Sequence, residues 1–479
     1  MKKILSLIIC SVCCDIVAAQ TYTLQQLKDS ALHNNIAIRN AQHSIDAAKE
    51  QRKEAFTKFF PSVNASGMRF NANKSLMKMS VEPMDMIPQS VQPMISTLSQ
   101  ILPAQALSFL TDPISFSMMK NGTIGSLMAI QPVFVGGQIV NGNKLAKVGE
   151  DVSRLQLQLS ENEVEKTVEQ YFWQLVSLQE KTKTIDAVDT LLRDIYKDVE
   201  VAVRAGVAMR NDLLQVQLRQ NDIESQRLKL NNGISIVRQL LGQYCGLKPH
   251  PSLTPNPSPK GEGNFKGEGE AFGRDESSYT FDIVLPDMNQ QDYLPPSPFG
   301  EGSGVRLLPE YQLLQKQVEA TKLQKKMAIG QNLPTVAVGA GYTYHNLMDI
   351  DRSYGMVFAT VSVPISDWWG GSHAIKRRKI EHQQAQEQLA DNAELLKIHM
   401  QNAWNGVEES YQQLLLAQRS IEQAEENLRL NRDYYRAGTS RMADLLEAQL
   451  LYQQSCDKHT DAFAAYQNKL LEYRQSCGQ

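Results

Sequence analysis

The sequence contains no apolar run long enough to cross a bilayer as a helix. Its longest apolar stretch, Ile4–Cys14, has about 11 residues, whereas a membrane-spanning helix needs about 20. Two lysines precede this stretch, and the small residues Val17-Ala18-Ala19 follow it. That order is typical of a cleaved secretory signal peptide, so we predict a signal peptide over residues 1–19 and a mature chain that begins at Gln20.

Without such a helix, a mature chain that crosses a membrane needs another structure. A closed β-barrel is the other fold that satisfies every backbone hydrogen-bonding group in lipid. The mean hydropathy of -0.35 is low for a membrane protein, but it fits a barrel with a wet lumen whose bulk lies outside the lipid. The net charge of -3 argues against a nucleic-acid partner.

Cysteine is also scarce, with six residues in all. Three of them lie in the signal peptide, where no lipobox precedes them, so we expect no lipid anchor. The other three, Cys245, Cys456 and Cys477, are odd in number and lack metal-ligand spacing. One pair can form a disulfide in an oxidising compartment, but a disulfide framework is excluded.

The short motifs of common active sites are missing as well. The mature chain contains no His-Glu-x-x-His, no nucleophile elbow and no Cys-x-x-Cys. Gly300-Glu-Gly-Ser-Gly304 resembles a phosphate-binding loop but lacks its lysine and the following serine or threonine. We therefore expect no enzyme, no cofactor and no metal site.

What the sequence does contain is an internal duplication. The matched segments are Arg204-Ala205-Gly206, Asp212-Leu213-Leu214 and Gln217-Leu218 in the first copy, and Arg436-Ala437-Gly438, Asp444-Leu445-Leu446 and Gln449-Leu450 in the second. Every match is offset by 232 positions, and the same offset carries Pro132 onto Pro364. Because no net gap separates the matched landmarks, the chain consists of two copies of one unit.

Between these landmarks each copy predicts a long α-hairpin. Over residues 138–203 apolar side chains recur at spacings of three and four, with no internal proline. About 65 helical residues span roughly 100 Å, which no compact domain accommodates, so this helix must pair along its length. Gly206 and Gly438 supply the backbone freedom to end the two helices, and the aspartate that follows each glycine can start the return helix.

Alternating segments at the far end of these helices predict strands. In Thr335–Tyr344 valine, alanine and tyrosine face one way and small residues the other, the pattern of a barrel strand with a lipid face. Met356–Val363 is the expected partner, and Val63–Phe70 and Ile124–Phe134 are the equivalents in the first copy. Four strands leave two open edges. Three chains would supply twelve strands, which can close into a barrel. The open edges require an oligomer but do not determine how many chains it contains.

An ordered set of short motifs accompanies these elements. They are Tyr22-Thr-Leu-Gln-Gln-Leu27, Asn34-Asn35, Phe60-Pro61-Ser62, Gln131-Pro132-Val133-Phe134, Gly136-Gly137, Leu308-Pro309-Glu310-Tyr311 and both Arg-Ala-Gly tips. In this order the chain resembles the TolC family of outer-membrane efflux proteins. The resemblance covers two structural repeats, residues 20–247 and 307–479, separated by residues 248–306.

The resemblance implies a homotrimer that is mainly α-helical, with a twelve-strand β-barrel in the outer membrane. A twelve-helix α-barrel would continue into the periplasm and close at its tips. It also implies a periplasmic adaptor and an inner-membrane pump as partners. The protein would then be the exit duct of a tripartite efflux or type I secretion system, with no chemistry of its own.

The same resemblance assigns roles at the tips. Asp444 and Glu447 match the family's acidic ring at the periplasmic entrance; they share a helix face, and threefold symmetry would gather six carboxylates that favour cations. The alternative is that Asp444 merely caps a helix. Glu447 corresponds to Gln215 in the first copy, so one such ring is expected.

Tyr435 and Asp212 match partners in the network that holds the family's gate shut. The family's gate arginine aligns with Ser440, one residue before Arg441, which leaves the role of Arg441 open. The candidate adaptor contacts are the two tips, Arg204, Ala205, Gly206, Arg436, Ala437 and Gly438.

Three other features carry competing interpretations. Residues 68–128 hold nine of the seventeen methionines, which can bind Cu(I) or Ag(I), although we favour adaptable packing in a long extracellular loop. Trp368-Trp369 can belong to an interfacial aromatic belt or pack at the joint between barrel and helix, which we favour. Residues 248–306, rich in proline, glycine and serine, predict a disordered or loosely packed linker.

Three other protein classes compete with the duct. A periplasmic adaptor also has a long hairpin, but it would carry one hairpin between lipoyl-like β halves rather than a duplicated unit. A coiled-coil scaffold would not explain the alternating strands. A secreted enzyme finds no supporting residue set.

Overall fold

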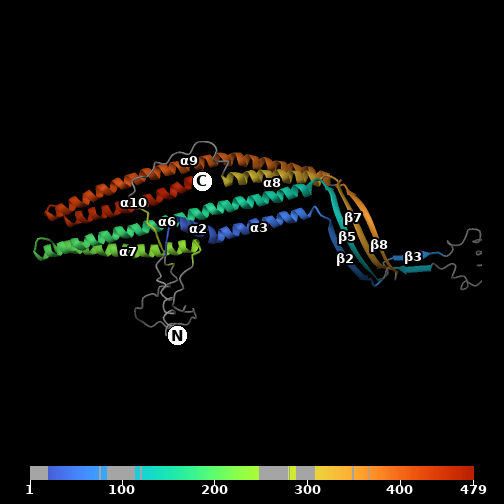
Figure 1. Cartoon of the computed structure of the whole chain (residues 1–479), viewed down its shortest axis with the longest axis horizontal. Helices are drawn as coiled ribbons and strands as arrows, with labels where there is room; N and C mark the ends of the chain where they lie inside the picture. The colour runs from blue at the N-terminus through green and yellow to red at the C-terminus, as the bar shows by residue number, and fades with distance from the viewer. Residues whose placement is uncertain are drawn as a thin grey trace, which may run out of the picture. The chain divides into compact units, whose positions relative to one another are not determined.

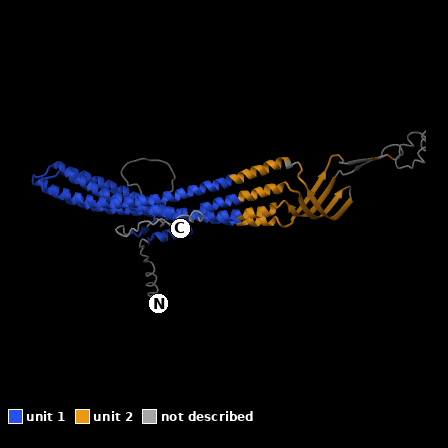
Figure 2. Ribbon diagram, turned by 90° about the horizontal axis from the view of Figure 1, so that it is seen from above, with its two compact units in different colours: residues 1–48, 148–319, 384–479 blue, residues 49–147, 320–383 orange. Residues whose placement is uncertain are grey.

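The computed structural model divides into two compact units (Figure 2). Unit 1 comprises residues 1–48, 148–319 and 384–479, and unit 2 comprises residues 49–147 and 320–383. The structure describes residues 20–74, 77–82, 114–118, 121–247, 279, 281–286, 308–347, 350–365 and 367–478. The predicted signal peptide lies outside these ranges. None of the described helices is long and apolar enough to cross a membrane.

Two long helical hairpins make up most of unit 1 (Figure 1). The first consists of α6 (Gln138–Arg204) and α7 (Arg210–Tyr244), and the second of α9 (Asp367–Arg436) and α10 (Met442–Ser476). The outgoing helices have 67 and 70 residues, and both return helices have 35. The two predicted α-hairpins are thus confirmed.

Both hairpins turn through the same hydrogen-bond pattern. The glycine amide donates to the carbonyl three positions earlier, and the next amide donates to the carbonyl five positions earlier. Gly206 and Gly438 have φ angles of 77° and 74°, in the left-handed region that glycine adopts without steric cost. This Schellman motif ends each outgoing helix, as the glycine positions predict.

One apolar face of α6 forms the centre of the unit 1 core. Val168 and Leu175 are fully buried and belong to a cluster that also contains Leu27 of α2 (Leu24–Asn34). The Trp173 ring of α6 lies 5.5 Å from the Phe463 ring of α10, edge to face. The two repeats therefore share one core.

A buried ion pair ties α2 to the same face of α6. Lys28 Nζ lies 2.6 Å from Glu169 Oε2, and the two side chains are 15% and 10% exposed. The Trp173 indole also donates to Glu169 Oε1 at 3.3 Å. Because a buried charge is costly unless it is paired, these contacts hold α2 in one position along α6.

A short strand from the predicted linker also packs into this core. β6 (Phe281–Ile283) pairs in parallel with β1 (Gln20–Tyr22). Phe281 and Ile283 are each 5% exposed, while the residue between them is exposed. The expectation of a loosely packed linker throughout 248–306 is therefore wrong for β6. Its alternation is only three residues long, too short to stand out as a strand pattern.

Unit 2 holds a four-stranded antiparallel sheet in the order β2-β5-β7-β8. Its strands are β2 (Ser62–Asn71), β5 (Asn121–Val135), β7 (Thr335–Leu347) and β8 (Ile350–Ser362). The four predicted strands are confirmed. Two helices lead into the sheet: α3 (Ile36–Thr57) precedes β2, and α8 (Pro309–Gln331) precedes β7. Two helices leave it, since β5 is followed by α6 and β8 by α9. Because the strands are antiparallel, all four helices join the same end of the sheet.

The strand register gathers the apolar positions on one face of the sheet. Val336 lies opposite Val361, and Tyr342 lies opposite Leu127. Val357 on the same face is 87% exposed and Val361 67%. An exposed apolar surface of this extent indicates contact with lipid or with another apolar partner, as the alternating pattern predicts.

A second strand pair interrupts the methionine-rich segment. β3 (Met77–Val81) pairs antiparallel with β4 (Ile114–Met118). The interpretation of this segment as irregular packing is therefore wrong for these strands, which the sequence pattern did not distinguish because each has only five residues. The methionines at 84 and 86 lie outside the described residues, so the metal-binding interpretation is untested.

Two changes within the predicted linker should have different effects on stability. Phe281→Ala would leave a cavity in the unit 1 core, with an expected loss of about 3 kcal/mol. Deletion of residues 249–273 keeps every described member of that core and should leave the melting temperature, followed by circular dichroism in detergent, near that of the wild type. A deletion variant that fails to fold or loses as much stability as Phe281→Ala would contradict this division of the linker.

Burial of His459 on α10 should make stability depend on pH. The side chain is 8% exposed, and burial lowers the pKa of His459 below its ordinary value of 6.5. Below that pH the unfolded chain takes up a proton that the folded chain does not, so stability falls as the pH drops. His459→Gln should reduce the loss of melting temperature between about pH 7.5 and about pH 5.5.

The matched control for this experiment is His43→Gln, since His43 is exposed on α3. It should show the full pH dependence of the wild type. An unchanged slope in the His459 variant would show that other groups cause the effect.

Candidate gate at the tips of the helical hairpins

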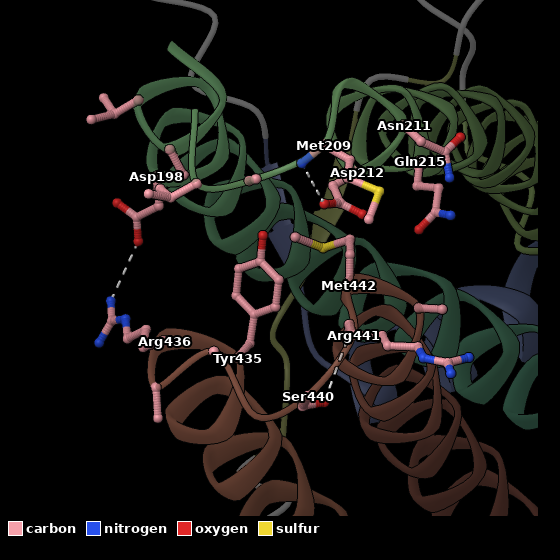
Figure 3. A pocket seen from close by; sticks show the side chains of 17 residues that line it. Asp198, Met209, Asn211, Asp212, Gln215, Tyr435, Arg436, Ser440, Arg441 and Met442 are labelled. Carbon is pink, nitrogen blue, oxygen red and sulfur yellow. Dashed lines mark hydrogen bonds and ion pairs between the residues drawn. The ribbon is translucent and has the colours of Figure 1, made fainter. Parts of the chain in front are cut away.

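The two hairpin turns enclose a cavity of about 990 Å³ (Figure 3). The end of α6 and the start of α7 form one side, and the end of α9 and the start of α10 form the other. The cavity brings together the three predicted gate residues Asp212, Tyr435 and Arg441. Asp444 and Glu447 are not part of its described lining.

Asp212 and Asp444 occupy equivalent positions in the first turn of their helices. Asp212 Oδ2 accepts a hydrogen bond from the Met209 amide at 3.1 Å, and Asp444 Oδ2 accepts from the Arg441 amide at 3.0 Å. Asp444 Oδ2 also accepts from the Ser440 hydroxyl at 3.2 Å. Both carboxylates thus satisfy an open amide at a helix start and favour its positive end.

Asp444 remains exposed to solvent although its carboxylate caps α10. Asp444 and Glu447 are both exposed, and a spacing of three residues places them on one helix face. The equivalent position to Glu447 in α7 is Gln215, whose Oε1 is buried without a hydrogen-bond partner in the described structure. Only the second hairpin presents two carboxylates on this face.

Tyr435 extends from the end of α9 toward the first hairpin (Figure 3). Burial raises the pKa of Tyr435, and the charges of Asp212 and Asp198 raise it further. In the described structure no hydrogen bond joins Tyr435 to Asp212. The two residues predicted as gate partners therefore line one cavity, and the Asp212 charge disfavours ionisation of Tyr435.

The direct ionic contact between the tips involves other residues. Arg436 Nη2 lies 3.5 Å from Asp198 Oδ2, and the two side chains are 56% and 62% exposed. Arg441, by contrast, is directed away from Tyr435 (Figure 3), and its backbone amide donates to Asp444 Oδ2. Sequence analysis assigned Arg436 to adaptor contact only, because nothing in the sequence shows that α6 brings Asp198 beside it.

The two Arg-Ala-Gly tips have the same backbone hydrogen-bond pattern, but their side chains differ chemically. Arg204 turns back onto Glu200 of its own helix at 2.8 Å, whereas Arg436 crosses to the other hairpin. The first turn exposes apolar side chains, with Val207 80% and Met209 74% exposed. The second turn has polar residues at the corresponding places.

A polar seam joins the return helices α7 and α10 further from the tips. Arg219 Nε donates to Gln449 Oε1 at 3.0 Å and Arg219 Nη2 to Gln453 Oε1 at 2.9 Å. Gln453 Nε2 in turn donates to Gln226 Oε1 at 2.7 Å. Gln449 and Gln453 are only 0% and 3% exposed, so these four residues form the polar seam in an otherwise apolar interface.

Sequence analysis missed the polar seam. Burial lowers the pKa of Arg219, and the charge of Asp222 acts against that shift. The Arg219 guanidinium donates its hydrogen bonds to amide oxygens rather than to carboxylates. The available signal was an arginine between the buried Val216 and Ile223, at core spacing on α7. A single polar residue on such a face does not reveal its partners on another helix.

Among the described residues, no group of three or more His, Cys, Asp or Glu side chains could hold a metal ion.

The second repeat of the chain matches a known family. Residues 309–479 match the family model described as outer membrane efflux protein. They include α8, β7, β8, α9 and α10. The second repeat of the chain therefore carries the domain of the outer membrane efflux protein family. The resemblance seen in the sequence motifs is thereby confirmed.

Solved outer-membrane channels share the fold of this efflux protein. OprN is 14% identical with a TM-score of 0.68, and the match covers 95% of this chain and 89% of OprN. CmeC of Campylobacter jejuni is 13% identical with a TM-score of 0.69, covering 95% and 85%. MtrE of Neisseria gonorrhoeae, solved in an open state, is 14% identical with a TM-score of 0.68, covering 95% and 88%. No curated protein sequence matches the chain.

Family and fold together assign the general function. This efflux protein is an outer-membrane exit duct of an efflux system. The matching family is one of channel and transport proteins.

The polar seam should show energetic coupling between α7 and α10. In a double-mutant cycle, Arg219→Ala and Gln453→Ala should couple by about 1 kcal/mol or more, because each change leaves the other buried partner unsatisfied. Chemical unfolding of the detergent-solubilised efflux protein measures each free energy.

Arg210 provides the control pair with Gln453. It is exposed and lies nine residues before Arg219, about 13 Å away along α7. Arg210→Ala and Gln453→Ala should therefore add within about 0.5 kcal/mol. Equal coupling in the two cycles would mean that the seam is not a specific contact.

Proposed function

We propose that three copies of this efflux protein close into one duct, gated at the hairpin tips and joined there to a periplasmic adaptor and, through it, to an inner-membrane pump. The sheet supplies the first argument. β2 and β8 are its edge strands, and each leaves one side without a hydrogen-bonding neighbour in the described chain. An apolar sheet with open edges is stable in lipid only when the edges are paired, and three chains supply twelve strands.

Exposed apolar residues on the helices support the same assembly. They form one stripe on α7, Leu214, Leu218, Leu228, Ile236 and Leu240, and another on α9, Leu395, Ile398, Leu416 and Tyr434. Each of these side chains is at least 40% exposed in the single chain. Neighbouring copies would bury both stripes and close the helices into an α-barrel, as long helices with an uncovered apolar stripe require.

The tip contacts fit a gate because they are weak. The Arg436–Asp198 pair is more than half exposed on both sides, and such a pair contributes only about 0.2–1 kcal/mol. Tyr435 and Asp212 face each other across a cavity rather than through a hydrogen bond. A closed state held by such contacts opens when a partner supplies a few kcal/mol of differential binding.

Asp444 and Glu447 are proposed as the acidic ring at the periplasmic entrance. Threefold symmetry would repeat the exposed pair three times around the axis, and a ring of carboxylates favours cations. The capping role of Asp444 fixes the start of α10 and so the position of the ring. The two functions are compatible, since the carboxylate stays exposed.

The turns themselves are the proposed adaptor contacts. They consist of Arg204, Ala205 and Gly206 in the first hairpin, and Arg436, Ala437 and Gly438 in the second, and all six are exposed. Val207 and Met209 add an apolar surface beside the first turn. The mature chain would be exported after cleavage of the signal peptide, place its hairpins in the periplasm and carry out no chemistry of its own.

The observation that carries this proposal is the four-stranded sheet with open edges, which two matched repeats build together. An adaptor with a single hairpin would have no such sheet. A coiled-coil scaffold would have no exposed apolar sheet face.

Single-channel recording in planar bilayers tests both the duct and the ring. The wild type should give small, cation-selective openings. Asp444→Asn/Glu447→Gln should lose most of that selectivity, because it removes six charges from the trimer, while asparagine keeps an oxygen acceptor for the cap.

Asp212→Asn is the matched control, since it makes the same change at the same cap position of α7. It should retain the cation selectivity of the wild type. A soluble periplasmic protein without channels would refute the duct, and an unchanged selectivity in the double variant would refute the ring alone.

A further inference from the structure

The apolar face of the sheet continues beyond its end onto α9. Val361 and Val363 are 67% and 42% exposed, Ile365 is 66% exposed, and Trp369 in the first turn of α9 is 84% exposed. The preferred interpretation that the tryptophan packs at the joint between sheet and helix is therefore wrong for Trp369. An exposed indole that extends an apolar surface is typical of a membrane interface.

Basic residues follow on the same face of α9. Lys376 and Ile380 lie seven and eleven residues after Trp369, which places all three on one side of the helix. Ile380 is 55% exposed and Lys376 is also exposed. Lys379 adds a further exposed charge next to them.

α8 presents the same combination beside α9. Lys322, Lys326 and Ile329 lie on one exposed face, at spacings of four and three residues. Two contacts join the helices at this level: Thr321 Oγ1 lies 3.1 Å from His382 Nδ1, and the Arg378 guanidinium donates to Gln324 at 3.0 Å.

The charges of these lysines are not compensated by the residues that the structure describes. The nearby Arg377 and Arg378 both pair with Glu381. In the described part of the chain, no carboxylate pairs with the four lysines Lys322, Lys326, Lys376 and Lys379, which we call the basic collar. All four lie within about 8–18 Å of the helix ends that join the sheet.

We propose that the basic collar binds the phosphate headgroups of anionic phospholipids in the leaflet nearest the helical end of the sheet. Trp369 marks the edge of the hydrocarbon region, and flexible lysine side chains reach back from the helices into the headgroup layer. Juxtamembrane clusters of uncompensated lysines are attracted to anionic lipid surfaces. The inference rests on the proposed placement of the sheet in the outer membrane.

The neighbours of the collar favour the lipid boundary over the duct interior as its location. Trp369, Ile380 and Ile329 are exposed on the same helix faces. A water-filled duct would leave these large apolar side chains in contact with water, whereas the lipid boundary accommodates both them and the lysines.

Lipid retention by the full-length protein tests the proposal. The probe is native mass spectrometry of protein taken from nanodiscs that contain equal amounts of phosphatidylglycerol and phosphatidylcholine. The wild type should retain phosphatidylglycerol preferentially. Lys322→Gln/Lys326→Gln/Lys376→Gln/Lys379→Gln should reduce that preference at least about tenfold, given about fivefold for each charge that contacts the leaflet.

The control variant removes four charges far from the sheet in sequence. Lys183, Lys197, Lys229 and Lys458 are exposed residues of unit 1, and their change to glutamine should leave the lipid preference unchanged. Equal losses in both variants, or none in the collar variant, would overturn the proposal.

Channel recordings on the same samples separate this proposal from the general function. The collar variant should conduct with wild-type ion selectivity, because the collar faces lipid. A shift toward cation selectivity with unchanged lipid retention would place the collar inside the duct and overturn the proposal. Absence of channels in the wild type would instead count against the duct.

Discussion

The burial of one apolar face of α6 is the interaction on which the rest of unit 1 depends. Isolated helices gain little stability from their own hydrogen bonds, and most helical stability in proteins comes from packing. The buried residues of α6 fall into two clusters, and α7 and α10 contribute to both. Because α2, β1 and β6 pack into the first cluster, every element that positions the hairpins is held through α6.

The packing becomes weaker toward the turns, where the gate is proposed. The cluster near α2 is rich in aromatic rings, such as the Trp173–Phe463 pair. The part of unit 1 nearer the tips holds a smaller apolar cluster and the polar seam around Arg219. At the tips themselves lies a cavity, with one exposed ion pair between the two hairpins. Removing a buried leucine costs about 2–5 kcal/mol and an exposed ion pair about 0.2–1. Motion confined to the tips therefore leaves the core intact.

Local patterns in the sequence predicted the two hairpins and the four-stranded sheet correctly. The hairpins follow from apolar spacing and from the glycines at 206 and 438, and the four strands follow from alternation. β6 was missed because three residues carry too little pattern, and β3 and β4 because each is a five-residue strand in an unusual composition. The exposure of Trp369 was misjudged because a tryptophan pair alone does not show whether a neighbour covers it.

The sequence by itself determined the two repeats, their hairpins and strands, the resemblance to the efflux proteins and the capping positions Asp212 and Asp444. These depend on periodicity, offset and local backbone bonds, which a linear chain displays directly. Only the tertiary structure decided that Arg436 meets Asp198, that Arg219 meets Gln449 and Gln453, and that four uncompensated lysines flank the sheet. Such contacts join residues on different helices, and their distances depend on how the helices pack rather than on any spacing along the chain.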